Sequence, residues 1–435
     1  MNSIEQTRRI PVIGEYDTVV CGGGPAGFVA AISAARCGQR TALIERFSFL
    51  GGMATASYVV PISGYFLRQK QAVGGIAWEF VERLREQGGA LVEYPRGNIS
   101  IDPEGYKIVA DEMVRESGVT LYTDSVVADV VKNGKSLTHV IIESKSGAEA
   151  IAGKCFIDAT GDGDVFFRAG AEMLPTPDSL QPVSLCFVLS GVDSTTDLLK
   201  DYIHHDGKVV KSSSPRVIRE YLLEEMEAGR APKFGGPWFN TLVKGDALAV
   251  NITRAEADAT DRGQMTEIEA RLRKDMYALV ERLRAKYPEF ANATVTVSGF
   301  SVGVRETRRI RGVYTLTLDD VIAGREFECP VAHCAHPMDI HSAKDAAQTL
   351  TRLPDRVFVP FEATVADAVD NLIAAGRCVS AEKEPYASLR VQATAMSIGE
   401  GAGLAAALKN RTGLPVSEIP RDELRRMIDE RGFVL

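Results

Sequence analysis

The stretch TVVCGGGPAGFVAA, residues 18–31, places three consecutive glycines between a β-branched run and a run of alanines. Residues 16–21 are short, apolar and β-branched, which is typical of a buried parallel strand. Residues 27–36 are rich in alanine and contain no helix breaker, so they are predicted to form a helix. The glycines between these two segments fit the pattern G-x-G-x-x-G of a dinucleotide-binding loop.

Each position of this loop has a physical role in the predicted site. Gly22 makes the tight turn out of the strand, and Gly24 lets the backbone approach a pyrophosphate without a Cβ in the way. Gly27 lets the helix pack close to the strand, and Pro25 and Ala26 complete the loop. The amino end of the helix would then face the phosphates with free N–H groups and a partial positive charge.

A carboxylate follows at the position where a ribose would lie. A second predicted strand, residues 41–44, ends at Glu45, about 20 residues beyond the glycines, where a carboxylate accepts ribose hydroxyls and repels a phosphate. The loop alone does not separate NAD from FAD, but a second diglycine soon after this acid favours a longer, deeply buried cofactor. The further residues expected to contact it are Arg46, Gly51, Gly52, Met53 and Ala54.

Length, charge and cysteine content exclude several classes of protein. A chain of 435 residues suggests two joined domains or about three. The formal net charge of −8 argues against a general nucleic-acid binder, which needs a basic face. Seven cysteines without a CxxC pair indicate reduced thiols, and no apolar run reaches the roughly 20 residues of a membrane span. We therefore expect a cytoplasmic protein with neither nucleic acid nor membrane as a partner.

The amino-terminal run resembles that of FAD-dependent oxidoreductases of the glutathione-reductase-like, two-dinucleotide-fold superfamily. More narrowly, it is similar to the large bacterial FAD-dependent oxidoreductase family, and the resemblance covers nearly the whole chain. It implies FAD as cofactor and an α/β fold, a Rossmann-like FAD-binding domain with a β-meander and an inserted α+β substrate or cap domain. The expected boundaries are 1–60, 101–169 and 359–435 for the FAD-binding domain, 61–100 for the base of the substrate domain, and 170–358 for the substrate or cap domain.

Residues 102–164 continue the nucleotide domain in this interpretation. A helix is predicted from Asp102 to about Glu116, followed by a strand at 119–123. Alternating strands flank Asn133-Gly134, and a strand at 155–158 leads into ATGDGD. By the resemblance these are the meander and a second nucleotide-contact loop. The expected contacts are Val127 (or Val126), Ala159, Thr160, Gly161 and Asp162.

The last block contains a predicted strand at 371–377 and a helix at 390–408, and it resembles the family ending NLLVAGR…S-x-R-V. In the family this ending lies against the isoalloxazine ring, where a helix N-terminus would stabilise the anionic reduced flavin. An ordinary core helix is the alternative. Residues 382–384 replace a histidine of relatives, so no covalent flavin is expected. The expected contacts are Gly376, Arg377, Ser380, Arg390, Val391 and Gln392.

Two further groups are candidates for the chemistry. The run VGVRETRRI, residues 302–310, resembles a VGVRESRRI block of the same family. Arg305 and either Arg308 or Arg309 are expected to hold an oxyanion, unless they form a structural network with Glu306. We retain Arg305 and Arg308 as the catalytic candidates.

Asp339 and His341 are two apart, so they share one face of an extended segment and form a plausible proton-abstracting pair. His333 and His336 precede them, but no further ligand set is obvious and no metal is expected.

The predicted function is hydride transfer between a small polar, anionic organic substrate and flavin N5, with the direction left open. A flavin-dependent monooxygenase is an alternative, disfavoured because residues 376–381 read GRCVSA where a GD motif is usual. An RNA-modifying flavoprotein is a second alternative, disfavoured by the acidic charge. No second G-x-G-x-x-G is present, so the electron acceptor or donor is unknown, and a homo-oligomer stays open.

Overall fold

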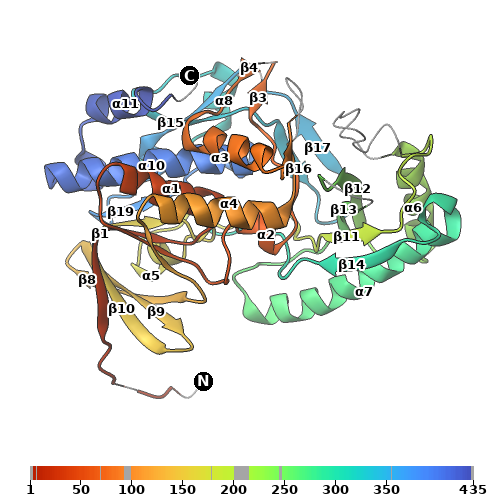
Figure 1. Cartoon of the computed structure of the whole chain (residues 1–435), viewed down its shortest axis with the longest axis horizontal. Coiled ribbons are helices and arrows are strands. Elements are labelled where there is room, and N and C mark those ends of the chain that lie inside the picture. The colour runs from red at the N-terminus through yellow and green to blue at the C-terminus, as the bar shows by residue number, and fades with distance from the viewer. Residues whose placement is uncertain are drawn as a thin grey trace.

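The computed structural model describes residues 3–5, 7–68, 70–92, 99–177, 179–199, 215–243, 247–353 and 355–432. Its buried apolar side chains form two clusters. The larger cluster surrounds the main sheet, and the smaller one surrounds a second sheet at the right of Figure 1. The two sheets lie at opposite ends of the view, with the longest helix, α7, beneath the second sheet.

The main sheet has seven strands in the order β7-β2-β1-β10-β9-β8, with β19 also paired to β10. Strands β7, β2, β1, β10 and β19 are parallel, whereas β8, β9 and the first half of β10 are antiparallel. This is a Rossmann-like parallel core carrying a meander. The bounds are β1 Val12–Cys21, β2 Thr41–Ile44, β7 Thr120–Tyr122, β8 Val126–Asn133, β9 Ser136–Ser144, β10 Gly147–Asp158 and β19 Leu372–Ala374.

Helices α1 (Pro25–Arg36) and α10 (Gln392–Thr412) pack against each other over the main sheet (Figure 1). Glycines on α10 permit this close approach. A Cβ at Gly399 would overlap the carbonyl oxygen of Ala26, and one at Gly403 would lie 2.6 Å from the carbonyl oxygen of Ala30. Backbone contact of this kind seats the amino ends of both helices at the same edge of the sheet. Helices α3 (Gly75–Glu86) and α4 (Pro103–Glu116) cover the same side.

The second sheet is antiparallel, in the order β12-β13-β11-β14. Helix α7 packs on it through a stripe of leucines, among them Leu272, Leu279 and Leu283, which are fully buried. Asp261 caps the start of α7 by accepting a hydrogen bond from the backbone N–H of Gln264. The bounds are β11 Phe187–Ser190, β12 Phe234–Thr241, β13 Leu248–Thr253, β14 Thr294–Ser298, α6 Arg216–Glu227 and α7 Arg262–Lys286.

Short elements connect these two parts. Strand β15 pairs with β18 and packs against α10, and β16 pairs with β17 in a second small two-stranded sheet. Their bounds are β15 Pro330–Cys334, β16 Met338–His341, β17 Gln348–Thr351 and β18 Val357–Pro360. The remaining elements are β3 Phe66–Leu67, β4 Lys70–Gln71, β5 Ala90–Leu91, β6 Ser100–Ile101, α2 Met53–Ala56, α5 Asp164–Arg168, α8 Leu318–Ala323, α9 Lys383–Leu389 and α11 Arg421–Asp429, with 3₁₀ turns at Pro288–Phe290, Phe361–Ala363 and Val416–Glu418.

Most predicted elements are present, with two differences. The strand predicted at 155–158 is the end of the longer β10, whose first half pairs with β9. The helix predicted at 390–408 corresponds to α10, which begins at Gln392 because Val391 is extended and runs to Thr412, and a separate short helix, α9, ends just before it at Leu389. Within the described ranges, no helix combines the length and apolar character needed to cross a membrane.

Candidate active site

The first cavity lies at the carboxyl ends of the parallel strands. The register pairs Cys21 with Ile44 and Asp158, and Asp158 with Ala374, so the loops that follow these strands meet at one edge. The cavity has about 980 Å³ of space between atoms, part of it open to solvent. The predicted cofactor residues that line it are Gly22, Gly24, Pro25, Ala26, Glu45, Arg46, Gly52, Met53, Val127, Ala159, Thr160, Gly161, Gly376, Arg377, Arg390 and Gln392.

Glycines shape the floor of this cavity. Gly22 has φ +104°, and a Cβ there would overlap the carbonyl of Ala159 on the adjacent loop. A Cβ at Gly24 would meet no atom closer than 3.8 Å, the Cα of Gly52, so the face of Gly24 is open to the cavity. Gly24 also begins helix α1 without a side-chain cap. The first turn of α1 is thus presented to whatever the cavity binds.

Glu45 is buried at the cavity wall. Its Oε2 accepts a hydrogen bond from the backbone N–H of Gly23 at 2.6 Å, and its Oε1 accepts one from that of Phe47 at 2.9 Å. Burial raises the pKa of Glu45 above its ordinary value despite these two bonds. Each oxygen retains a second lone pair for a ligand hydroxyl. The contact with a ribose stays a prediction.

A second cavity, with about 1,640 Å³ of space between atoms, adjoins the first. Four residues line both, so the cavities meet where α2, the turn after β19 and the start of α10 converge. The four shared residues are Met53, Arg377, Arg390 and Gln392. Val391 lines the second cavity only.

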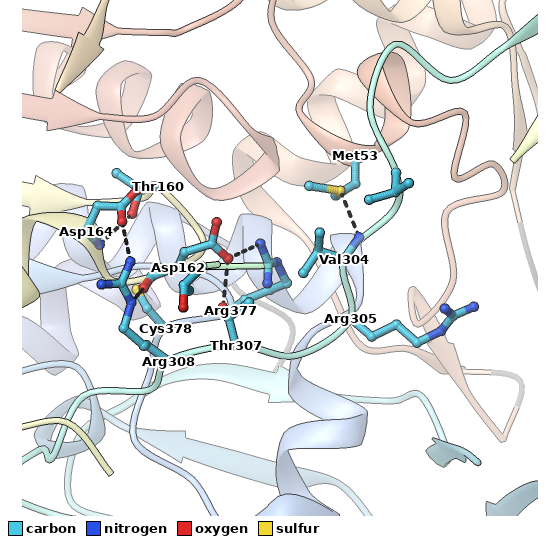
Figure 2. Close-up of polar contacts among 12 residues, drawn as sticks. Met53, Thr160, Asp162, Asp164, Val304, Arg305, Thr307, Arg308, Arg377 and Cys378 are labelled. Atoms are coloured by element: carbon cyan, nitrogen blue, oxygen red, sulfur yellow. Dashed lines mark hydrogen bonds and ion pairs between the residues drawn. The ribbon is translucent and has the colours of Figure 1, made fainter. Parts of the chain in front are cut away.

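Polar atoms at this junction lack partners. Among the described residues, Nη1 of Arg377, Nε of Arg390 and Oε1 of Gln392 are buried and make no hydrogen bond. Arg377 is held by the carboxylate of Asp162 at 2.9 Å, which also accepts the hydroxyl of Thr307 at 2.7 Å (Figure 2). Buried polar groups in native proteins are almost always satisfied, so the junction is built for a polar ligand.

Other cofactor candidates lie outside the first cavity. Asp162 supports Arg377 from behind the wall. Ser380 is fully buried and pairs with the hydroxyl of Thr315 instead. The predicted residues that do not line the first cavity are Gly27, Gly51, Ala54, Asp162, Ser380 and Val391. Sequence reasoning missed several residues that line the first cavity, including Ile44, Phe47, Ser125, Ala375 and Ala395. Ile44, Ala375 and Ala395 are small or apolar, and nothing in the sequence marks such side chains as ligand contacts.

Arg308 lines neither cavity, so the geometry of the site gives no support to its predicted catalytic role. Its guanidinium donates to the carbonyl of Asp162 and the carboxylate of Asp164, and it lies over the ring of Phe167. Arg305 lies at the other end of this stretch and lines the second cavity (Figure 2). Residues 304–309 belong to no helix or strand, so no regular period fixes the directions of the Arg305 and Arg308 side chains. Arg309 also lines neither cavity and donates to the carbonyl of Ala381.

Asp339 and His341 lie on β16, and both line the second cavity. Nε2 of His341 is 3.0 Å from Oδ2 of Asp339, and Nη2 of Arg390 is 3.2 Å from the same oxygen. Burial and the charges of Arg305 and Arg254 lower the pKa of His341 to about 3, although Asp339 acts in the opposite direction. His341 is therefore neutral at pH 7.

Sequence reasoning missed Arg254, on the segment after β13. Its Nη2 lies 3.4 Å from Nδ1 of His341, and its Nη1 donates to the hydroxyl of Ser184 at 2.6 Å. Nothing in the surrounding sequence distinguishes this arginine from the other basic residues. His333 packs against Phe358 rather than the cavity. Within the part of the chain that the structure describes, no three His, Cys, Asp or Glu side chains are arranged to hold a metal ion.

A family model, FAD dependent oxidoreductase, matches residues 17–428. The chain belongs to the FAD-dependent oxidoreductase family. It is a flavoprotein enzyme with FAD as its cofactor.

Among curated relatives, dihydrolipoyl dehydrogenase of Trypanosoma brucei brucei is 53% identical over 45 residues, 10% of this chain and 9% of that protein. A tRNA uridine 5-carboxymethylaminomethyl modification enzyme of Sulfurihydrogenibium is 30% identical over 149 residues, 30% of this chain and 22% of that enzyme. The matched parts span less than a quarter of the length of either relative.

Solved structures share the fold. A geranylgeranyl bacteriochlorophyll reductase-like protein of Thermoplasma acidophilum has a TM-score of 0.51 at 13% identity, covering 96% of this chain and 84% of that one. The flavin-dependent brominase Bmp2 has a TM-score of 0.51 at 13% identity, covering 95% and 84%. These likenesses concern the α/β fold with its Rossmann-like core.

The residues of the two cavities fit this cofactor. The open face of Gly24 at the start of α1 suits a pyrophosphate, and the free lone pairs of Glu45 suit ribose hydroxyls. The unpartnered atoms of Arg377, Arg390 and Gln392 offer donors and an acceptor to a heteroaromatic ring at the junction.

Proposed function

We propose that this enzyme transfers a hydride between a small polar, anionic organic molecule and its flavin. When bound, FAD supplies a hydride acceptor or donor at N5. The observation that carries the proposal is the junction, because Met53, Arg377, Arg390 and Gln392 line both cavities. A ring held at this junction from the first cavity would present one face to a substrate in the second.

We further propose that residues 170–358, with 61–100 at their base, act as the substrate domain. The support is that the wall of the second cavity draws on both segments. Ser184, Trp238 and Asn251 come from the second sheet and its edges, and Pro61 and Phe66 come from the shorter segment. On this reading the remaining segments, 1–60, 101–169 and 359–435, hold FAD, in the manner of the glutathione-reductase-like superfamily.

His341 is the proposed proton acceptor or donor. Asp339 accepts from Nε2–H, and the lone pair of Nδ1 then accepts a hydrogen bond from Nη2 of Arg254 at 3.4 Å, which must be given up before Nδ1 takes a proton. Nδ1 faces Arg254, so the ring remains neutral until the local positive charge is reduced. An anionic substrate would reduce that charge as it binds, and so would increase the basicity of His341 when it is needed.

The test is anaerobic reduction of the purified yellow enzyme by a panel of hydroxy acids, amino acids, amines and sugars. We expect loss of the oxidised flavin absorbance with at least one anionic member, and no loss with free FAD under the same conditions. The opposite direction is tested by oxidising the reduced enzyme with enoates. Incorporation of an oxygen atom from O₂ into a product, or a flavin response only to tRNA, would overturn the proposal in favour of a monooxygenase or an RNA-modifying enzyme.

A further inference from the structure

Two buried arginines beside the second cavity share one neutral acceptor. The hydroxyl oxygen of Ser184 accepts from Nη1 of Arg254 at 2.6 Å and from Nη1 of Arg305 at 2.8 Å. Both arginines are less than a tenth exposed. Neither forms an ion pair with any residue that the structure describes, so two guanidinium charges lie close together without a carboxylate of their own.

The surrounding charges do not compensate them. Arg390 adds a third guanidinium, and Asp339 is the carboxylate that faces the group, already shared between Arg390 and His341. Burial, and then the repulsion between Arg254 and Arg305, lower the pKa of Arg305 well below its ordinary value. Burial lowers the pKa of Arg254 to about 10. The charges of Arg390 and Arg219 lower this pKa further, whereas Cys186 and Asp339 act in the opposite direction. Buried unpaired cations are costly, so a site that retains them gains by binding an anion.

The two arginines differ in access. Arg305 lines the second cavity, and its Nε and Nη2 have no hydrogen-bond partner among the described residues. These two atoms form one edge of a planar fork that matches a carboxylate. Arg254 does not line the cavity, and its Nη1 is used by Ser184, by Asn251 and by a backbone carbonyl. Arg305 therefore offers the contact, and Arg254 supplies charge from behind it.

We propose that Arg305 binds a carboxylate of the substrate, so that the substrate class is small organic carboxylates. Arg254 is a positioning residue that acts through Ser184 and His341. The cavity extends from Arg305 to Arg390 and Gln392 at the junction, so the rest of such a molecule is directed to the flavin side. The inference rests on the proposed function only for the hydride transfer at the junction, and carboxylate binding by Arg305 is independent of it.

The experiment measures binding without turnover. We would titrate the holoenzyme with succinate and with its neutral diamide, at fixed ionic strength, and follow the flavin difference spectrum and the melting temperature. Saturable binding of succinate but not of the diamide is expected. Arg305→Gln should weaken succinate binding at least about tenfold, as expected for loss of a charge-assisted pair. Arg254→Gln should weaken it less, and Arg216→Gln, an exposed residue of α6, should leave it unchanged.

Retention of FAD by each variant shows that it folds. If Arg305→Gln does not retain FAD, Arg305→Lys keeps the charge without the fork and should show an intermediate loss of affinity. Equal affinity for succinate and the diamide, equal affinity for inorganic phosphate and succinate, or full affinity in a loaded Arg305 variant would each overturn the inference. Anion binding without any flavin reduction would instead contradict only the proposed function.

Discussion

Nε2 of His341 lies 3.0 Å from Oδ2 of Asp339, two residues before it on β16. Burial alone would raise the pKa of Asp339, but the hydrogen bond from His341 and the charge of Arg390 hold it below its ordinary value. Asp339 is therefore ionised and accepts the Nε2 proton, which fixes the tautomer with the lone pair on Nδ1. That lone pair faces Nη2 of Arg254, which lies behind the wall of the second cavity.

Asp339→Asn should disable the proposed acid–base function while preserving the shape of the site. A neutral amide does not stabilise the imidazolium that forms when Nδ1 takes a proton, so the rate of flavin reduction by the substrate should fall by about 10²-fold or more. Stopped-flow absorbance under anaerobic conditions measures this rate. His341→Gln should show a similar loss with FAD still bound. A rate within twofold of the wild type in both variants would remove the pair from the mechanism.

The pH profile should lack the usual histidine limb. His341 has a pKa of about 3 in the free enzyme, because burial and the nearby arginines disfavour its charged form. As a base it remains unprotonated throughout the neutral and mildly acidic range, so kcat/KM should not fall through pH 6.5. The measurement is kcat/KM from pH 5 to 8, which reports the free enzyme. A fall of kcat/KM with a pKa near 6.5 that disappears in His341→Gln would contradict a lowered pKa of His341 in the free enzyme.

Glu400 should make the protein less stable as the pH rises toward neutrality. It is buried in α10, accepts the backbone N–H of Ile76 at 2.8 Å, and has a pKa raised to about 7, mainly by burial. The folded state therefore holds a proton that the unfolded state, with an ordinary pKa of 4.5, has released. Stability from this group is present below about pH 4.5 and is lost between there and pH 7, by about 3 kcal/mol.

Glu400→Gln should flatten this dependence, measured by urea unfolding of the holoenzyme at several pH values. Glu116→Gln, whose side chain is more than half exposed, is the matched control and should leave the slope unchanged. An unaltered slope in Glu400→Gln would show that other groups, such as the buried Asp158 with a pKa of about 6, account for it.

Two glycine substitutions should separate cofactor binding from folding. Gly24 has φ −69°, and a methyl group there meets no chain atom closer than 3.8 Å but enters the first cavity. Gly24→Ala should therefore fold and bind FAD about tenfold or more weakly, because the backbone approach to the pyrophosphate is blocked. Gly399→Ala overlaps the backbone of Ala26 and should lower stability by about 1–3 kcal/mol.

Fluorescence of released FAD measures the first effect, and thermal unfolding measures the second. Normal FAD affinity in Gly24→Ala would argue that the pyrophosphate does not lie over this loop. Unchanged melting of Gly399→Ala would mean that α1 and α10 can separate without cost.

Local signals in the sequence determined much of the FAD-side architecture. The strand, glycine loop and helix around Gly22 are present as predicted, and so is α4, where Asp102 caps the helix by accepting from the backbone N–H of Glu104. The hairpin around Asn133-Gly134 and the shared face of Asp339 and His341 were also predicted. These features depend on neighbours within a few residues, where backbone conformation and side-chain periodicity act directly.

Only the tertiary structure decided which arginines meet. Arg305 and Arg308 stand three apart in one motif, yet one lines the second cavity and the other is held by Asp162 and Asp164. Arg254, which has no motif, is brought to Ser184 across 70 residues of chain. Which guanidinium stays unpaired depends on the carboxylates that packing brings to it, and no local pattern carries that information.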